Sequence, residues 1–328
     1  MHPKFIKNNC FLLLFLYSIT LQAQSNQFLI PSDTLNKKRF WLTAGTGAAI
    51  YTGAVIGLSQ VWYAESPQSG FHFFNDAGEW EHLDKTGHLY STYFESKWSF
   101  QGARWIGIPH RKAAWLGAGL GMFYQLTIEI MDGFSEEWGF STYDIGFNTL
   151  GALTFLGQEL AWQEQRITLK YSAIPKSYPD YQVTSVDGTT TMPLSIRAEE
   201  IYGKSYAARL IKDYNIQTHW ASANIASFIP NDTHRFPKWL NVAVGYGAEN
   251  MYGGFENQWT YEGKDYVLDA NLYPRHRQFF ISPDIDFTKI ETDRPFLKTL
   301  FFFLNMVKVP APAVEFNSLG KTKWHWLR

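Results

Sequence analysis

The feature that most constrains this chain is an uncharged, glycine-rich stretch from Phe40 to Ala64. It contains no Asp, Glu, Lys or Arg, and as a helix it is long enough to cross the roughly 30 Å hydrocarbon layer of a bilayer. Gly53 and Gly57 have the G-x-x-x-G spacing that lets two helices approach closely in lipid, whereas in water such glycines weaken a helix. The stretch therefore predicts a helix of the membrane type.

A second uncharged stretch covers residues 113–128 and has the same spacing at Gly117 and Gly121. The apolar periodicity of the neighbouring segments indicates further helices. Together they predict a module of about four helices that occupies residues 40–165. The expected helices of this module cover about 40–64, 81–97, 113–128 and 144–163.

The chain changes character after this module. Prolines and a Ser/Thr-rich run predict a linker or long loop at 166–203, and a short helix is expected at 204–213. Apolar and polar residues alternate along 279–287, which is typical of a strand. The predicted fold class is α+β, a membrane-type helical bundle followed by a β-containing domain at 204–328. The other candidate strands cover 240–246, 314–316 and 324–326.

The N-terminus has the pattern of a secretory signal peptide. Two lysines precede the apolar run 11–21, and a small residue follows, which predicts a signal at 1–23 and a polar segment at 24–39. The apolar run is too short to span a membrane comfortably. Cys10 is the single cysteine and precedes the run, so it cannot be the lipid-modified first residue of a mature lipoprotein. We therefore expect an exported envelope protein without disulfides or thiol chemistry.

The composition of the chain limits the classes of partner that we expect. Lys and Arg total 29 against 30 Asp and Glu, so no bulk field attracts nucleic acid. Aromatic residues make up 17%, which favours a membrane interface or a densely packed core. Membrane lipid and other envelope proteins are the expected partners. With the signal cleaved, the basic run 37–39 and the acidic segment 76–84 reverse the positive-inside rule, so the choice between inner and outer membrane stays open.

Three pairs of polar residues have helical spacing, so that each pair projects from one face of its helix. They are Asp84 with His88, Glu129 with Asp132, and Asp144 with Asn148. Ionisable groups near a bilayer are costly, and they usually face a bundle interior where they pair or perform chemistry. If the helices converge, these side chains share one site.

The same residues belong to an ordered set of motifs: DKTGH at 84–88, EIMDGFS at 129–135, WGFS at 138–141 and D-x-x-x-N-x-x-G at 144–151. This set resembles the YfiM family, a domain of unknown function in proposed periplasmic lipoproteins. A shorter series of motifs, D-K-x-x-H, then E, then D-x-x-x-N-x-x-G, is similar to the motifs of VanZ-like membrane proteins. The resemblance covers about residues 40–165 and implies a family without implying a reaction.

One interpretation of the cluster is catalytic, as an intramembrane enzyme or transporter-like protein acting on lipid or isoprenoid phosphates. His88 would carry a proton and Asp84 would orient it, with Glu129 as the third catalytic group. The candidate substrate-binding residues are Lys85, Arg104 and Asn148.

Two other interpretations use the same residues. One imidazole with several carboxylates suits a hard divalent cation such as Mn²⁺, Mg²⁺ or Ca²⁺, with Asp132, Asp144, Glu129 and His88 as ligands. Alternatively, the carboxylates form a structural network with Lys85, Trp N–H groups and helix N-termini. We expect an exported envelope protein of unassigned activity with a structural or binding role at a membrane, and the sequence leaves open whether it is an enzyme.

Overall fold

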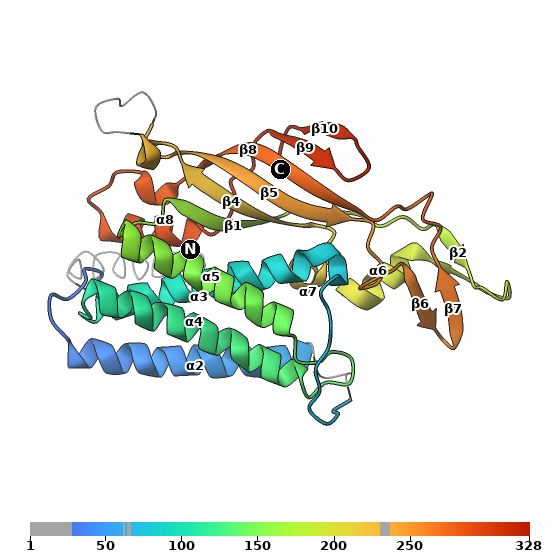
Figure 1. Ribbon diagram of the computed structural model, residues 1–328, viewed down its shortest axis with the longest axis horizontal. Coiled ribbons are helices and arrows are strands. Elements are labelled where there is room, and N and C mark those ends of the chain that lie inside the picture. The colour runs from blue at the N-terminus through green and yellow to red at the C-terminus, as the bar shows by residue number, and fades with distance from the viewer. Residues whose placement is uncertain (1–27, 62, 64–66, 230–236) are drawn as a thin grey trace, which may run out of the picture.

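The structure, a computed structural model, describes residues 28–61, 63, 67–229 and 237–328. The expected signal peptide at 1–23, with Cys10, lies outside these residues. The described chain contains seven α-helices and a six-stranded antiparallel sheet, which confirms the α+β class. Figure 1 shows the sheet on one side of a layer of long helices, with a small lobe at one end.

Four long helices form the expected module. Helices α2, α4 and α5 have bounds within a few residues of those predicted, whereas α3 extends well beyond its expected end at about residue 97. Helix α3 lies at the centre, because it packs against α4 and α5 and also contacts the first strands of the sheet. Helix α2 lies at the outer side of α4 (Figure 1). The four helices are α2 (Lys37–Val61), α3 (Leu83–Trp105), α4 (His110–Asp132) and α5 (Thr142–Ala161).

Glycines allow α4 and α5 to approach α3 closely. A Cβ at Gly121 would lie 2.4 Å from Ser96 Oγ, and a Cβ at Gly151 would lie 2.4 Å from the Leu89 carbonyl oxygen. The G-x-x-x-G spacing in α4 therefore marks a true helix contact. Gly53 and Gly57 in α2 make no such contact within the described chain, because no described atom lies within 4 Å of a Cβ at either position. Helix α2 turns this face outward.

The sheet has the strand order β1-β4-β5-β8-β9-β10, and every neighbouring pair is antiparallel. All four candidate strands of the sequence lie in it. The segment 166–203 differs from the expected loop, because it contains strand β1, a short hairpin and a helix. The sheet strands are β1 (Ile167–Ala173), β4 (Gln217–Asn224), β5 (Leu240–Glu249), β8 (His276–Ile285), β9 (Ala313–Asn317) and β10 (Thr322–His325).

The remaining elements surround this sheet. Two short hairpins and helix α6 form the small lobe, which has its own core of tyrosine, tryptophan and aliphatic side chains. The lobe contains β2 (Gln182–Thr184), β3 (Thr191–Pro193), α6 (Leu194–Tyr202), β6 (Gln258–Tyr261) and β7 (Lys264–Val267). Helices α7 (Tyr206–Lys212) and α8 (Pro295–Leu304) precede β4 and follow β8. The expected short helix at 204–213 is thereby confirmed.

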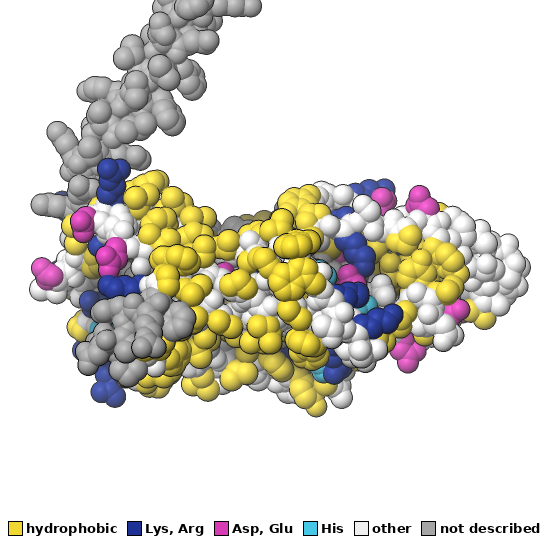
Figure 2. All heavy atoms as spheres, turned by 90° about the horizontal axis from the view of Figure 1, so that it is seen from above, with side chains coloured by type: hydrophobic (Ala, Val, Ile, Leu, Met, Phe, Trp, Pro, Cys, Tyr) yellow, Lys and Arg dark blue, Asp and Glu magenta, His cyan; other side chains and the backbone are white. Residues whose placement is uncertain are grey.

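The sheet buries its polar face and exposes much of its apolar face. In β8, Asp284 is 2% exposed, whereas Phe279 and Ile281 are 46% and 51% exposed. Asp284 forms an ion pair of 2.8 Å with Lys170 of β1 and accepts a hydrogen bond from Ser222 of β4. Figure 2 shows hydrophobic side chains gathered across the middle of the face on the sheet side of the molecule. This distribution is the reverse of a water-soluble sheet, whose apolar face packs on the core.

A segment after α8 encloses the polar face. Its backbone is hydrogen-bonded to Tyr171 of β1 through residues 306 and 308, and Ala311 exchanges two backbone hydrogen bonds with Arg328 after β10. The ammonium group of Lys308 lies 5.0 Å from the centre of the Trp220 ring. The first and last strands are thus linked through this segment, and the sheet curls around a polar interior.

Lys97 of α3 is buried among aromatic rings, and its ammonium group lies 5.3 Å from the Phe302 ring centre. No carboxylate of the described residues forms an ion pair with it. Burial lowers the pKa of Lys97 to about 8. Because the folded-state pKa lies below the unfolded value, charging this group opposes folding below pH 8, and the penalty disappears as the pH rises toward 10.5. We expect Lys97→Met to raise the free energy of unfolding at pH 7 by up to ~3 kcal/mol.

Denaturant unfolding at pH 7 and pH 10 tests this expectation. The gain from Lys97→Met should be large at pH 7 and small at pH 10. Lys321→Met is the matched control, because Lys321 is exposed and the same substitution there should change stability little at either pH. Equal effects of the two substitutions at pH 7 would contradict the role of burial.

Candidate functional site

The three polar pairs of the sequence lie at one end of α3, α4 and α5. Asp84, Lys85 and His88 belong to the first turns of α3, and Glu129 lies in the last turn of α4. Asp144 lies in the first turn of α5, where the Ser141 side chain accepts a hydrogen bond of 3.0 Å from its backbone N–H and caps the helix. The start of α3 and of α5 and the end of α4 therefore meet in one acidic cluster.

The turn before α3 orients the first residues of this helix toward the cluster. Trp80, Glu81 and His82 all have positive φ, between 49° and 66°, a backbone region that residues other than glycine seldom occupy. Glu81 is held there by Arg275 and Arg277, with Nε–carboxylate distances of 3.3 and 2.9 Å. Contacts from the small lobe and the sheet thus support this strained entry into the helix.

Lys85 is the electrostatic centre of the acidic cluster, which consists of Asp76, Asp84, Lys85, His88, Glu129, Asp132 and Asp144. Its ammonium group lies 2.5 Å from Asp76, 3.0 Å from Asp84 and 2.7 Å from Asp144, and the side chain is 1% exposed. Burial alone would lower the pKa of Lys85. The carboxylates of Asp84 and Asp144 have a larger opposite effect, so the pKa lies well above its usual value. Because three carboxylates already surround the ammonium group of Lys85, the geometry argues against its predicted role in binding a phosphate group.

The two ring nitrogens of the His88 imidazole face different residues of the cluster. Nδ1 lies 3.1 Å from Asn148 Oδ1 and 3.4 Å from Glu129 Oε1. Nε2 faces Asp84 Oδ1 at 3.9 Å and Asp144 Oδ2 at 3.8 Å. Burial lowers the pKa of His88, but the carboxylates of Asp84, Asp144 and Glu129 raise it to about 9. Each ring nitrogen of His88 therefore has at least one carboxyl group within 4 Å.

Several carboxyl groups of the cluster are buried deeply enough to resist ionisation. Burial raises the pKa of Glu129 to about 8, that of Asp144 to about 7 and that of Asp132 to about 6. The Tyr63 hydroxyl donates a hydrogen bond to Asp132. Among the described residues, no ion pair within 4 Å joins Asp132 to Lys85 or His88, so Asp132 lies at the edge of the cluster.

Arg104 lies far from these residues. It is sixteen residues after His88 on the same helix, which corresponds to roughly 24 Å. Its guanidinium group donates a hydrogen bond of 2.7 Å to the Ile108 carbonyl oxygen at the opposite end of α3. The prediction that Arg104 binds a substrate at the cluster is therefore wrong. The sequence predicted a helix that ends at about residue 97, whereas α3 continues to Trp105.

Three contacts in or beside the cluster involve residues without a helical pattern in the sequence. Asp76 accepts a 2.6 Å hydrogen bond from Ser141, and Tyr214 donates a 2.8 Å hydrogen bond to Asp84. His219 of β4 lies 2.8 Å from the Thr86 hydroxyl, and burial lowers the pKa of His219 to about 4. The acidic run at 76–84 is a weak signal for Asp76. No local signal links the two residues near β4 to α3.

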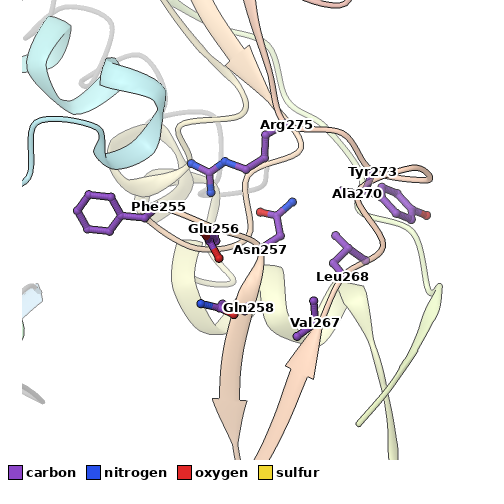
Figure 3. A pocket seen from close by; sticks show the side chains of 9 residues that line it. All are labelled: Phe255, Glu256, Asn257, Gln258, Val267, Leu268, Ala270, Tyr273 and Arg275. Carbon is purple, nitrogen blue, oxygen red and sulfur yellow. The ribbon is translucent and has the colours of Figure 1, made fainter. Parts of the chain in front are cut away.

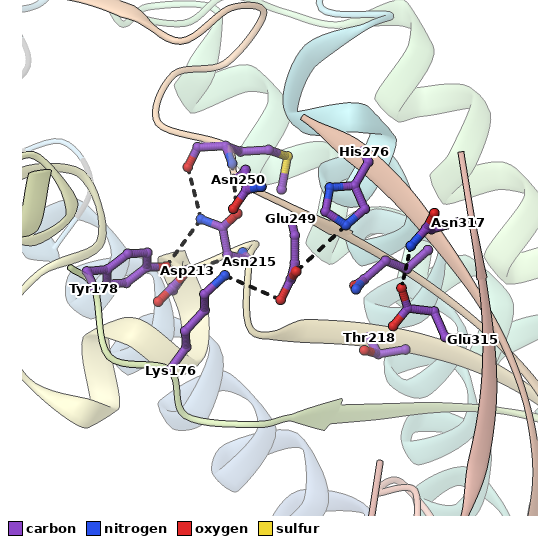
Figure 4. Close-up of polar contacts among 12 residues, drawn as sticks. Lys176, Tyr178, Asp213, Asn215, Thr218, Glu249, Asn250, His276, Glu315 and Asn317 are labelled. Atoms are coloured by element: carbon purple, nitrogen blue, oxygen red, sulfur yellow. Dashed lines mark hydrogen bonds and ion pairs between the residues drawn. The ribbon is translucent and has the colours of Figure 1, made fainter. Parts of the chain in front are cut away.

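Two other polar regions lie apart from the acidic cluster. A pocket in the small lobe lies beside β6 and β7 (Figure 3), but the Arg275 side chain at its edge donates hydrogen bonds to the carbonyl oxygens of Gly253 and Gly254. Figure 4 shows polar contacts near the end of the sheet, where Asp213 accepts a 2.6 Å hydrogen bond from Tyr178. Glu315 accepts a 2.9 Å hydrogen bond from Asn317. These groups have internal partners and act as structural links.

The acidic cluster lies within the part of the chain that matches a known family. The model of a family of predicted periplasmic lipoproteins, the domain of unknown function DUF2279, matches residues 71–156. The match contains all seven residues of the cluster, and it shows neither the YfiM name nor the likeness to VanZ proteins. It agrees with an exported envelope protein of unassigned activity. No curated protein and no solved structure matches the chain.

Proposed function

We propose that this protein is a membrane-bound envelope protein whose exposed helices α2, α4 and α5 contact lipid directly. The observation that carries the proposal is the placement of α2. By length and composition, Lys37–Gln60 could cross a membrane, and none of its apolar window is buried inside the protein. A soluble protein would cover such a helix, because exposed apolar surface of this extent is costly in water.

The apolar surface continues from α2 onto its neighbours. Trp115 and Phe123 of α4 are more than half exposed, and Leu153 of α5 is 56% exposed. Tyr51 joins α2 to α4, since its hydroxyl lies 2.8 Å from Thr127 Oγ1 and its ring packs on Phe123. The three helices therefore present one continuous apolar surface, which suits the hydrocarbon region of a bilayer.

Charge at the ends of the helices fits the same proposal. Basic residues at 37–39 and 111–112 begin α2 and α4. These two ends lie together, because the backbone N–H of Asn36 donates to Ile106 and the Arg39 side chain donates to Trp105. Cationic side chains at the edge of an apolar surface favour anionic lipid headgroups. The acidic cluster lies at the opposite end of α3 and α4.

This geometry favours lipid binding over phosphate chemistry. The hypothesis of an enzyme that acts on lipid phosphates needs a cationic side chain that can bind the phosphate group. Lys85 is instead paired with three carboxylates, and Arg104 lies at the far end of α3. The basic end of the helices is separated from His88 by most of the length of α3. We therefore propose a binding role at the membrane as the function.

The proposal predicts that charges on α2 abolish membrane binding. With the full chain and vesicles that contain anionic phospholipid, Ile50→Glu with Ile56→Glu should lower the vesicle-bound fraction at least tenfold, because a charged group in hydrocarbon costs about 3 kcal/mol. Both side chains are exposed, so the substitutions should leave the fold intact. The control is Gln182→Glu with Thr189→Glu in the exposed β2–β3 hairpin. Equal binding by both variants, or release of the wild-type chain by high salt alone, would contradict the proposal.

A further inference from the structure

The arrangement around His88 Nε2 has the spacing of ligands around one ion. Asp84 Oδ1 and Asp144 Oδ2 lie 3.9 and 3.8 Å from this nitrogen, and the three ligand atoms all lie within 4.8 Å of one another. Distances near 3.8 Å are too long for hydrogen bonds. They suit two ligands that each lie about 2.1 Å from a shared metal ion.

The hydrogen bonds around the two carboxylates leave one oxygen of each facing His88. Lys85 holds Asp84 by Oδ2 and Asp144 by Oδ1. Asp84 Oδ1 and Asp144 Oδ2 are the oxygens that face the imidazole, and Asp84 Oδ1 also accepts a hydrogen bond from Tyr214. Lys85 therefore fixes the orientation of both carboxylates from outside the site.

The other ring nitrogen of His88 is supported in the way that metal-binding histidines usually are. Such histidines present one nitrogen to the ion and donate the other N–H to a carboxylate or carbonyl oxygen. Nδ1 of His88 has Asn148 Oδ1 at 3.1 Å and Glu129 Oε1 at 3.4 Å. Glu129 is completely buried, and its Oε1 has no hydrogen-bond partner among the described residues. A metal-bound His88 with its proton on Nδ1 would direct a donor toward this unpartnered oxygen.

The acidic cluster also holds more carboxyl groups than bases, so a bound divalent cation would take the place of protons on its carboxyl groups. The five carboxyl groups of Asp76, Asp84, Glu129, Asp132 and Asp144 face the bases Lys85 and His88. Buried carboxylates need a compensating charge or a proton. His88 and Asp84 retain side-chain exposures of 14% and 23%, so the protein does not cover these two side chains completely.

We propose that Asp84, His88 and Asp144 bind a divalent metal ion of the Mn²⁺ class, with Glu129 as a positioning residue for His88. Two carboxylates with one imidazole mix the oxygen ligands that Mn²⁺ and Mg²⁺ prefer with a nitrogen ligand that Mg²⁺ rarely takes. Water that reaches the partly exposed side chains of His88 and Asp84 would complete the coordination shell. This site goes beyond the proposed lipid contact, because it lies at the opposite end of the helices from their basic residues.

Manganese binding to the purified full chain in detergent tests the proposal. We expect one Mn²⁺ per chain, with a nitrogen hyperfine coupling from His88 in its electron paramagnetic resonance spectrum. His88→Ala should lose this coupling and weaken Mn²⁺ binding at least 100-fold, and Glu129→Gln should weaken it about 10- to 100-fold. His72→Ala is the matched control, since His72 lies outside the cluster and should leave binding unchanged.

The wild-type spectrum keeps the test decisive even if a variant fails to fold. Absence of stoichiometric Mn²⁺, or a bound ion without nitrogen coupling, overturns the site. Unchanged affinity in folded His88→Ala also overturns it. Vesicle binding is measured separately with the α2 variants, so failure of the metal site and failure of the lipid contact give different results.

Discussion

Replacing Lys85 by methionine is expected to lower the free energy of unfolding by about 3–5 kcal/mol, because it leaves buried carboxylates without their shared cation. Asp76, Asp84 and Asp144 all lie within 3.0 Å of its ammonium group, and Lys85 is almost completely buried. Methionine fills a similar volume, so the loss would arise from charge more than from packing. Denaturant unfolding of the detergent-purified chain measures the effect.

The control for this substitution is Lys204→Met. Lys204 also has an acidic partner, Glu199 at 3.6 Å, but its side chain is 83% exposed. Exposed pairs contribute less than about 1 kcal/mol, so little change is expected. Adding Asp76→Asn to Lys85→Met should recover part of the stability. If Lys85→Met behaves like Lys204→Met, the pairing of Lys85 with the carboxylates does not hold the helices together.

Substitution of Gly121 by alanine should destabilise the protein by about 3 kcal/mol, because the helices cannot accommodate a methyl group between them. The new Cβ would lie 2.4 Å from Ser96 Oγ and 2.9 Å from the Thr92 carbonyl oxygen. The second contact is with backbone, so α3 and α4 must move apart. Thermal and denaturant unfolding both report this change.

Gly119 provides a matched control two residues away on the same helix. No described atom lies within 4 Å of a Cβ at this position. Gly119→Ala should therefore stabilise the helix by up to ~1 kcal/mol through the better helix propensity of alanine. Opposite signs at the two glycines are the expected result. Two similar values would show that α3 and α4 are not in the close contact described.

The sequence was sufficient to locate the long helices and most sheet strands, because their periodicity is local. Spacing alone did not reveal which way a helix face points. Gly117 and Gly121 lie against α3, whereas the identically spaced Gly53 and Gly57 face outward. The alternation in β8 had the same limit: it separated polar from apolar residues but did not reveal that the polar side, with Asp284, is buried.

The acidic cluster could be anticipated only in part. Helical spacing placed Asp84 and His88 on one face, and the structure brings them to Asp144 and Glu129. The central role of Lys85 depends on the fold, because its partners come from three separate segments. Arg104 was misplaced, since the length of α3 decides which end of the molecule it occupies.

The hydrogen bond between Tyr214 and Asp84 sets an order of events for the newly made chain. The two residues are 130 positions apart, so this contact closes a long loop, whereas α3, α4 and α5 meet through much shorter ones. Distant contacts form late, because the loss of chain entropy precedes their stabilising effect. A chain interrupted before Tyr214 could assemble its long helices, yet Asp84 of the acidic cluster would lack this hydrogen bond. Folding of the sheet against the helices would then be the last step in the assembly of the protein.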